Sequence, residues 1–529
     1  MAGSRDLYEL IGTLSKSEKR YCRMMLESGA GRRADSCLRL FEILSGMDEP
    51  DERALQAAVK DEAFAGHLAV TKNHLYEHLL RSLRAYNSAN TTQKRIRTLL
   101  DGVEVLFSRG LQQQARQRLH DARELAERYD FLQEQLLIAR LESRIDMYTG
   151  YAGVTPEQIQ QRRMHVRHIM ENISNFWDYV HISDIAAYEM SHQGYGGSDV
   201  GTRLHEIIHS PQTATAPPSS LQAQQLHRDT LRMYYLMRAR YHEGYEHSVQ
   251  WLRFVESYPM NDRIDQLNYI SLLHNHVVLS LKLGRVAEAR STFEKLSALE
   301  PRGRWMQWQQ KRLGFFCRLD LLMLRLDHEA ITGMADDLEA ICNGQENGIT
   351  RQMRMCYAMN LAYAQFANGY LREAACTLHP VINNNKLGVR HDALCVARLM
   401  QLMIHYDLGD LELLPYLIRS AYRFITRCRG MFDADRVVLQ FMRRLPNMVT
   451  QDELIAEFKR VREELAAIAS DPVNHEASSL AGILLWVDSK ITGRTLSELA
   501  REEYGVVEMA DTAEHGAGPV NWADNRVEA

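Results

Sequence analysis

The sequence has few of the residues that interrupt helices, with only 12 prolines and 30 glycines among 529 residues. A many-stranded β-sandwich or barrel needs more turns than these supply, so the composition argues against an all-β fold. No run of apolar residues approaches the roughly 18 that span a bilayer, and the N-terminal stretch lacks the apolar core of a signal peptide. We therefore expect a cytoplasmic protein that makes no membrane contact.

The sequence also lacks regularly spaced cysteines, an excess of basic residues and the sequence motifs of common enzymes. The eight cysteines include no C-x-x-C pair, which predicts small core residues rather than a disulfide framework or a zinc site. The formal net charge of −5 argues against bulk electrostatic binding of nucleic acid, although it is compatible with a local basic patch. Gly-rich phosphate-binding loops and the G-x-S-x-G string are absent, so we expect neither an enzyme nor a cofactor.

What the sequence does contain is apolar residues at helical spacing along almost its whole length, as in residues 99–107 and 480–491. The intervals are filled by Leu, Ala, Gln, Glu, Arg and Met, which favour helices. The pattern therefore predicts an all-α fold. In the first 90 residues it predicts helices near 5–12, 15–28, 34–45, 51–61 and 71–87.

A recurring spacing of glycine, a small residue and a large apolar residue indicates helix hairpins. In one clear case Gly284 is followed by Ala289, Phe293 and Pro301. The glycine ends one helix with a left-handed turn, and the small residue lets the returning helix approach closely. Gly110, Gly369 and Gly409 have the same spacing, although Leu414 is large where the others have Ala, and Gly244 begins a version one residue shorter. The 85 residues between Gly284 and Gly369 accommodate two units if a turn without glycine falls near Leu326.

This spacing resembles the tetratricopeptide repeat (TPR) family, best over residues 268–301 and 355–382. The resemblance implies a TPR-like α-solenoid of antiparallel helix pairs, which binds a protein or peptide segment in a concave groove lined by the first helix of each pair. The groove positions that it implies are Arg97, Tyr234, Arg238, His242, His274, Lys282, Tyr363 and Tyr406. This mixture of Tyr, His and a few bases suits an amphipathic helix or short peptide. We therefore expect a protein-binding scaffold or adaptor.

Changes in composition predict five regions. Residues 191–220 are rich in glycine and proline and mark a joint, and residues 505–529 lack helical periodicity and predict a disordered acidic tail. The other three are an N-terminal helical domain over 1–90 that caps the repeats, a first helical-repeat segment over 91–190, and a TPR-like domain over 221–504.

One alternative function is a transcriptional regulator with a DNA-binding head and a TPR-like sensor. Residues 65–75 are compatible with a helix, a turn and a helix that starts at an N-cap, Thr71. In that case nucleic acid binds through residues 65–97. The side chains facing DNA would be Lys72, Asn73, His74 and Arg81, extended by Arg84, Lys94, Arg95 and Arg97.

A more distant alternative is a zinc metallopeptidase. The string His205-Glu206-x-x-His209 has the spacing of two zinc ligands on one helix face, with the glutamate as general base. However, Pro211 ends the helix just after the second histidine, and no third ligand follows at the spacing of that family. The inverted string at residues 74–78 lacks the surrounding domain, so we expect no bound metal.

Overall fold

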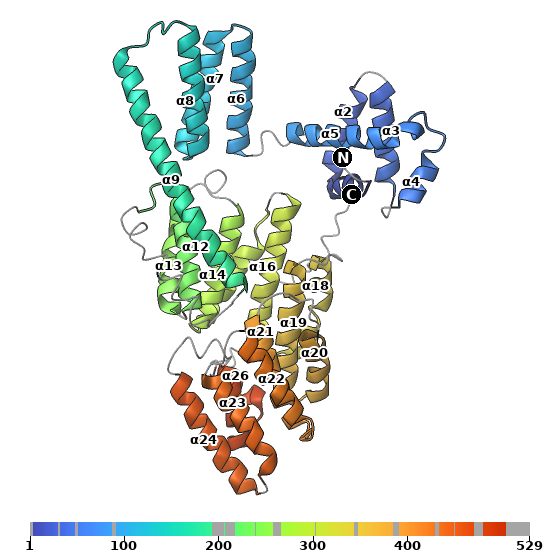
Figure 1. Cartoon of the computed structure of the whole chain (residues 1–529), viewed down its shortest axis with the longest axis vertical. Helices are drawn as coiled ribbons and strands as arrows, with labels where there is room; N and C mark the ends of the chain where they lie inside the picture. The colour runs from blue at the N-terminus through green and yellow to red at the C-terminus, as the bar shows by residue number, and fades with distance from the viewer. Residues whose placement is uncertain are drawn as a thin grey trace, which may run out of the picture. The chain divides into compact units, whose positions relative to one another are not determined.

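The computed structural model describes residues 4–29, 32–47, 51–86, 91–192, 206, 217–238, 240–257, 266–301, 303–342, 348–383, 391–428, 433–448, 450–469 and 480–503. All regular structure in these residues is helical and none of them forms a strand, which confirms the all-α prediction (Figure 1). The chain divides into two compact units between Glu171 and Asn172, and each is described by itself.

The first 86 residues fold as a block of helices around their own apolar core. The helices are α1 (Ser4–Thr13), α2 (Lys16–Glu27), α3 (Arg32–Ser45), α4 (Glu52–Ala58) and α5 (Leu68–Tyr86). Helix α2 starts at a capping box, in which the Ser15 hydroxyl accepts the Glu18 N–H and the Glu18 carboxylate accepts the Ser15 N–H. The five predicted helices are confirmed, with ends within about three residues of those expected.

The rest of the first unit holds α6 (Thr92–Ser108), α7 (Gln112–Arg128), α8 (Leu132–Tyr148) and the start of α9 (Pro156–His192), which crosses the division between units. Helices α6 and α7 pack together through Ala115, which is completely buried, as the hairpin spacing predicts. The buried carboxylate of Asp146 on α8 accepts from Arg116 and Arg162 at 2.7 Å each. These two ion pairs join α8 to α7 and to the start of α9.

The second unit continues with helices that pack mainly on their neighbours in the chain. Helix α14 contacts α13, α15 and α16, and α19 contacts α16, α20 and α21. The bounds are α12 (Leu221–Met237), α13 (Tyr241–Glu256), α14 (Gln266–Lys282), α15 (Val286–Ser297), α16 (Arg304–Met323), α17 (His328–Thr332), α18 (Ala335–Cys342), α19 (Gly348–Ala367), α20 (Leu371–Asn383), α21 (His391–Asp407), α22 (Leu414–Cys428), α23 (Asp433–Arg444), α24 (Gln451–Ala469), α26 (Leu480–Thr492) and α27 (Leu496–Glu503).

The turns between paired helices confirm most of the glycine pattern. Gly284, Gly369 and Gly409 have φ of +69°, +83° and +81°, and each lies between two packed helices. The turn without glycine is confirmed as well, because Leu326 lies between α16 and α17 with φ of +50°. The Asn368 side chain donates to the Leu326 carbonyl at 2.8 Å, which stabilises this costly conformation.

The prediction of a turn at Gly244 is wrong. Gly244 lies inside α13 and does not have a positive φ, so it is not a turn residue. An added Cβ there would approach Leu279 on α14 and Tyr235 on α12 at 3.2 Å each. Gly244 therefore allows α13 to pack closely on both neighbouring helices, which is the task that the pattern assigns to the small residue.

Two of the predicted regions lie mostly beyond the described residues. The tail over 505–529 is entirely outside them, and of the joint over 191–220 only a few residues at its ends and Glu206 are inside. In the part of the chain that is described, no helix combines the length and the apolar character needed to span a bilayer.

Candidate binding surfaces

The eight expected groove positions are divided between the two units, and those of the second unit differ in burial. Arg97 lies on α6 in the first unit, where its guanidinium pairs with the buried Glu134 at 3.2 Å. Tyr234 is only 4% exposed and packs with Ala186 in a small core, so its expected place on a surface is wrong. His242 is exposed on α13, the second helix of its pair, and Arg238 is the exposed C-cap of α12.

His274 and Lys282 do lie together, with charged neighbours on adjacent helices. We name this set the polar face; it consists of Asp229 and Arg232 on α12, His274 and Lys282 on α14, and Arg312 and Asp320 on α16. His274 interacts with Arg312. Lys282, which follows His274 by eight residues, interacts with Asp320, which follows Arg312 by eight residues. Helices α14 and α16 therefore run side by side in the same direction.

The protein surroundings shift the titration of two groups on the polar face. Burial lowers the pKa of His274 to about 4, and the nearby positive charges of Arg232 and Arg312 lower it further. Burial raises the pKa of Asp320 to about 6, although the Lys282 ammonium opposes this. Both side chains keep partial contact with solvent. The polar face therefore offers a neutral imidazole and charges of both signs in a recessed setting.

Helix α26 of the same chain covers part of Tyr363 and Tyr406, so both side chains are only partly exposed. Trp486 on α26 packs edge-on against Tyr406 at 5.8 Å between ring centroids. A Cβ added at Gly482 on α26 would lie 3.2 Å from the Tyr363 hydroxyl oxygen, so α26 approaches α19 closely at Gly482. A largely apolar helix thus already lies on the side of α19 and α21 where the resemblance places a ligand.

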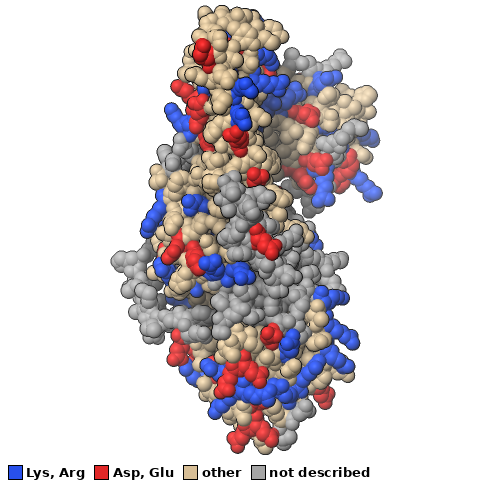
Figure 2. All heavy atoms as spheres, turned by 60° about the vertical axis from the view of Figure 1, so that its left-hand side comes forward, with Lys and Arg blue, Asp and Glu red and all other residues tan. Residues whose placement is uncertain are grey.

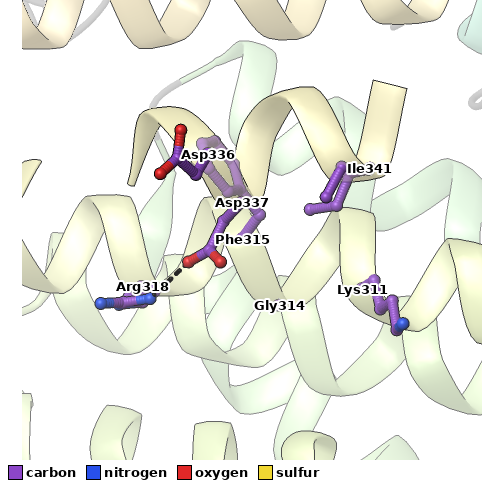
Figure 3. A pocket seen from close by; sticks show the side chains of 8 residues that line it. Lys311, Gly314, Phe315, Arg318, Asp336, Asp337 and Ile341 are labelled. Atoms are coloured by element: carbon purple, nitrogen blue, oxygen red, sulfur yellow. Dashed lines mark hydrogen bonds and ion pairs between the residues drawn. The ribbon is translucent and has the colours of Figure 1, made fainter. Parts of the chain in front are cut away.

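A pocket of about 260 Å³ opens between α16 and α18 (Figure 3). Its lining residues are Lys311, Gly314, Phe315 and Arg318 from α16, and Asp336, Asp337, Ala340 and Ile341 from α18. Arg318 donates to Asp337 at 2.8 Å, and Figure 3 shows Lys311 and Asp336 at opposite ends of the pocket. An apolar floor with charged groups around it suits one large apolar side chain better than a whole cofactor.

A Ser–His–Glu network on α13, α14 and α15, buried at its serine and histidine, is a feature that no sequence pattern predicts. The Ser248 hydroxyl lies 2.8 Å from His276 Nδ1, and His276 Nε2 lies 3.0 Å from the Glu288 carboxylate. Burial lowers the pKa of His276, although Glu288 opposes this. Ser248 is only 4% exposed and also lies 2.8 Å from the Tyr245 carbonyl, so no substrate can approach its hydroxyl. The network therefore satisfies buried polar groups between three helices.

The structure corrects two residues of the DNA-binding alternative on α5, while Arg81 and Arg84 are exposed there. The expected N-cap at Thr71 is wrong, because α5 begins at Leu68 and the Thr71 hydroxyl donates to the His67 carbonyl inside the helix. Lys72 is only 6% exposed, and its ammonium pairs with Glu52 at 2.7 Å. Lys72 therefore ties α5 to α4 and is not presented to a ligand.

The histidine strings make no metal centre in the described residues, where no group of three or more His, Cys, Asp or Glu side chains is placed to hold an ion. His205 and His209 lie outside those residues. His78 of the inverted string instead lies 3.3 Å from the Ser82 hydroxyl one turn later in α5.

Comparison of the chain with protein-family models found no match, and no curated protein matches it either.

Proposed function

We propose that this chain is a cytoplasmic scaffold or adaptor that catalyses no reaction. Its TPR-like array would bind a segment of another polypeptide on the polar face of α12, α14 and α16. Support for the array comes from the helix pairs that pack in chain order and from the turn residues Gly284, Leu326, Gly369 and Gly409. The cytoplasmic location rests on the composition of the sequence.

The single observation that carries the proposal is the position of α26. This helix buries Trp486 and Leu485 against neighbouring helices while it covers Tyr363 and Tyr406 on α19 and α21. The first helices of these two pairs therefore already hold a helical segment. The polar face belongs to first helices earlier in the chain and keeps its side chains partly accessible.

The chemistry of the polar face indicates what kind of segment it would take. Lys282 and Arg312 attract carboxylates and Asp320 attracts a base, whereas Arg232 and Asp229 pair with each other at 4.0 Å. His274 stays neutral at pH 7 as a hydrogen-bonding group. A short peptide or helix with charges of both signs fits this arrangement. The pocket of Figure 3 shares α16 with the polar face and would receive one large apolar side chain as an anchor.

Site-specific photo-crosslinking tests the proposal. A photoreactive amino acid replaces Ser271, which is partly exposed on α14, and a matched control replaces Glu294, which is exposed on the second helix α15. We expect the Ser271 variant, produced in the natural host cells, to form adducts that share one recurring partner sequence. Equal adducts at both positions, or none at Ser271, would contradict the proposal.

A further inference from the structure

Helix α22 exposes a stripe of arginines opposite the side that it buries. Its sequence contains Arg419, Arg423 and Arg427 and no acidic residue. All three side chains are exposed, while the apolar side chains of the other face, such as Ile418, lie in the core. Because one turn separates successive arginines, the positive charges recur about every 6 Å along the helix.

The stripe forms one wall of an open pocket of about 420 Å³, to which α21 adds Arg398. Among the described residues, four arginines, two aromatic residues and one serine line this pocket, and no carboxylate does. Over most of the face drawn in Figure 2, by contrast, basic and acidic side chains are interspersed. The pocket therefore concentrates positive charge on a chain whose net charge is −5.

Aromatic rings hold two of the arginines in place. The Arg398 guanidinium lies 4.3 Å from the centroid of the Phe424 ring, and it donates to the Ser420 hydroxyl at 3.4 Å. The Arg419 guanidinium lies 4.9 Å from the centroid of Tyr416, whose side chain is 65% exposed. Such contacts orient the planar guanidinium groups at the edge of the pocket.

We propose that this pocket, which we name the arginine pocket, binds single-stranded nucleic acid. Its parts are those by which proteins hold single strands without reading their sequence: a row of cations that follows the phosphates and an exposed aromatic ring on which a base stacks. Arginine suits phosphate in particular, because its planar N–H groups bind two oxygens at once.

An acidic peptide is the main competitor, and the geometry disfavours it. The backbone of α22 is hydrogen-bonded within its own helix, so it offers an extended peptide no main-chain partners. Such a peptide would gain charge contacts alone and would have no base to stack on the exposed ring of Tyr416. A duplex is disfavoured too, because its stacked bases cannot reach that ring.

Fluorescence anisotropy with the full chain tests the proposal, with labelled 12-nucleotide single strands of RNA and DNA as probes. A duplex of the same length, a polyglutamate peptide and inorganic polyphosphate serve as competitors. We expect saturable binding to single strands that weakens as salt rises. In the double variant Arg423→Ala and Arg427→Ala, the slope of log affinity against log salt should fall by about 0.7 for each phosphate that the variant no longer neutralises.

Tyr416→Ala separates base stacking from simple charge attraction. We expect it to weaken binding of single strands about tenfold, the size of one base–aromatic stack, without changing the salt slope. Arg372→Ala removes an exposed arginine on α20 outside the pocket and should change nothing. Because all of these side chains are exposed, the variants should keep the thermal midpoint of the parent chain.

Three results would overturn the proposal. One is single-strand binding that survives the double arginine variant undiminished, or is absent altogether at about 50 mM salt. The second is polyglutamate or duplex competing better than an unlabelled single strand. The third is a combination of two observations: Tyr416→Ala binds single strands with the affinity of the parent chain, and polyphosphate competes as well as RNA does. The pocket would then be a general polyanion site.

Discussion

The indole N–H of Trp486 donates to the carboxylate of Asp407 at 3.2 Å, across 79 residues of chain. Lys490, one turn further along α26, pairs with the same carboxylate at 2.8 Å. Trp486 is itself 1% exposed and packs on Phe441 and Phe458 as well as Tyr406. These contacts fix α26 over α21 and make it an integral part of the second unit.

Replacing Trp486 should therefore destabilise the second unit strongly. We expect Trp486→Ala to lower the free energy of unfolding by about 3–5 kcal/mol, because it leaves a cavity and removes a hydrogen bond to a buried carboxylate. Urea unfolding followed by circular dichroism measures this. Trp305→Ala is the matched control, since Trp305 is 56% exposed and should cost little. Equal effects of the two changes would mean that α26 is loosely attached.

The left-handed turn at Gly369 should resist any residue with a Cβ. The Cβ added by Gly369→Ala would meet no atom within 4 Å. We therefore expect the free energy of unfolding to fall by about 1–2 kcal/mol, solely because of the positive φ of +83°. Gly12→Ala in α1 also meets no atom within 4 Å but does not have a positive φ. We expect Gly12→Ala to leave the thermal midpoint unchanged or slightly raised, and a decrease there as large as at Gly369 would contradict the argument.

We expect the contribution of Asp320 to the free energy of unfolding to decrease as pH rises. The pKa of Asp320 is about 6 in the folded chain and 3.8 in the unfolded reference, so folding favours the protonated acid. The unfolded chain then binds fewer protons than the folded chain between pH 3.8 and about 6, and this contribution declines across that window. We expect Asp320→Asn to gain stability relative to the parent above pH 6 and to match it near pH 4. Denaturant unfolding at several pH values measures the difference, and a constant difference would contradict the assignment.

The ion pair between Lys72 and Glu52 should matter more than exposed pairs in the same block. Glu52→Gln leaves the 6% exposed Lys72 ammonium without its carboxylate, and because Glu52 is itself 46% exposed we expect a loss of only about 1 kcal/mol. Glu9→Gln breaks the exposed pair with Arg5 and should have no measurable effect. Differential scanning calorimetry compares the two. No difference between them would show that Lys72 reaches solvent.

Local signals in the sequence predicted the features that local physics determines. A positive φ next to a helix end favours glycine, so Gly284, Gly369 and Gly409 could be identified in advance, and the interval between them located the turn at Leu326. The prediction of an N-cap at Thr71 was wrong because a 3₁₀ turn precedes Leu68 and α5 already begins at Leu68. Helix periodicity alone does not say which preceding residue starts the helix.

The binding surfaces were harder to predict because they depend on contacts between distant segments. Helical spacing places Tyr234 on the same helix as Asp229, but only packing against Ala186 shows that Tyr234 is buried. Nothing local to Tyr406 indicates that a helix about 80 residues later covers it. The arginine pocket was missed for a related reason, since Arg398 joins the stripe on α22 only when α21 and α22 pack.

The most direct test of the proposed function is the affinity of the full chain for the polypeptide captured at position 271, measured by isothermal titration calorimetry with a synthetic peptide. We expect Lys282→Ala and Arg312→Ala each to weaken binding about tenfold, as for the removal of one charged group from an interface. Lys295→Ala removes an exposed base on α15 that pairs with Glu256 on α13, and this variant should bind like the parent chain. Full affinity in the Lys282 and Arg312 variants, with the folded state intact, would show that polypeptides do not bind at the polar face.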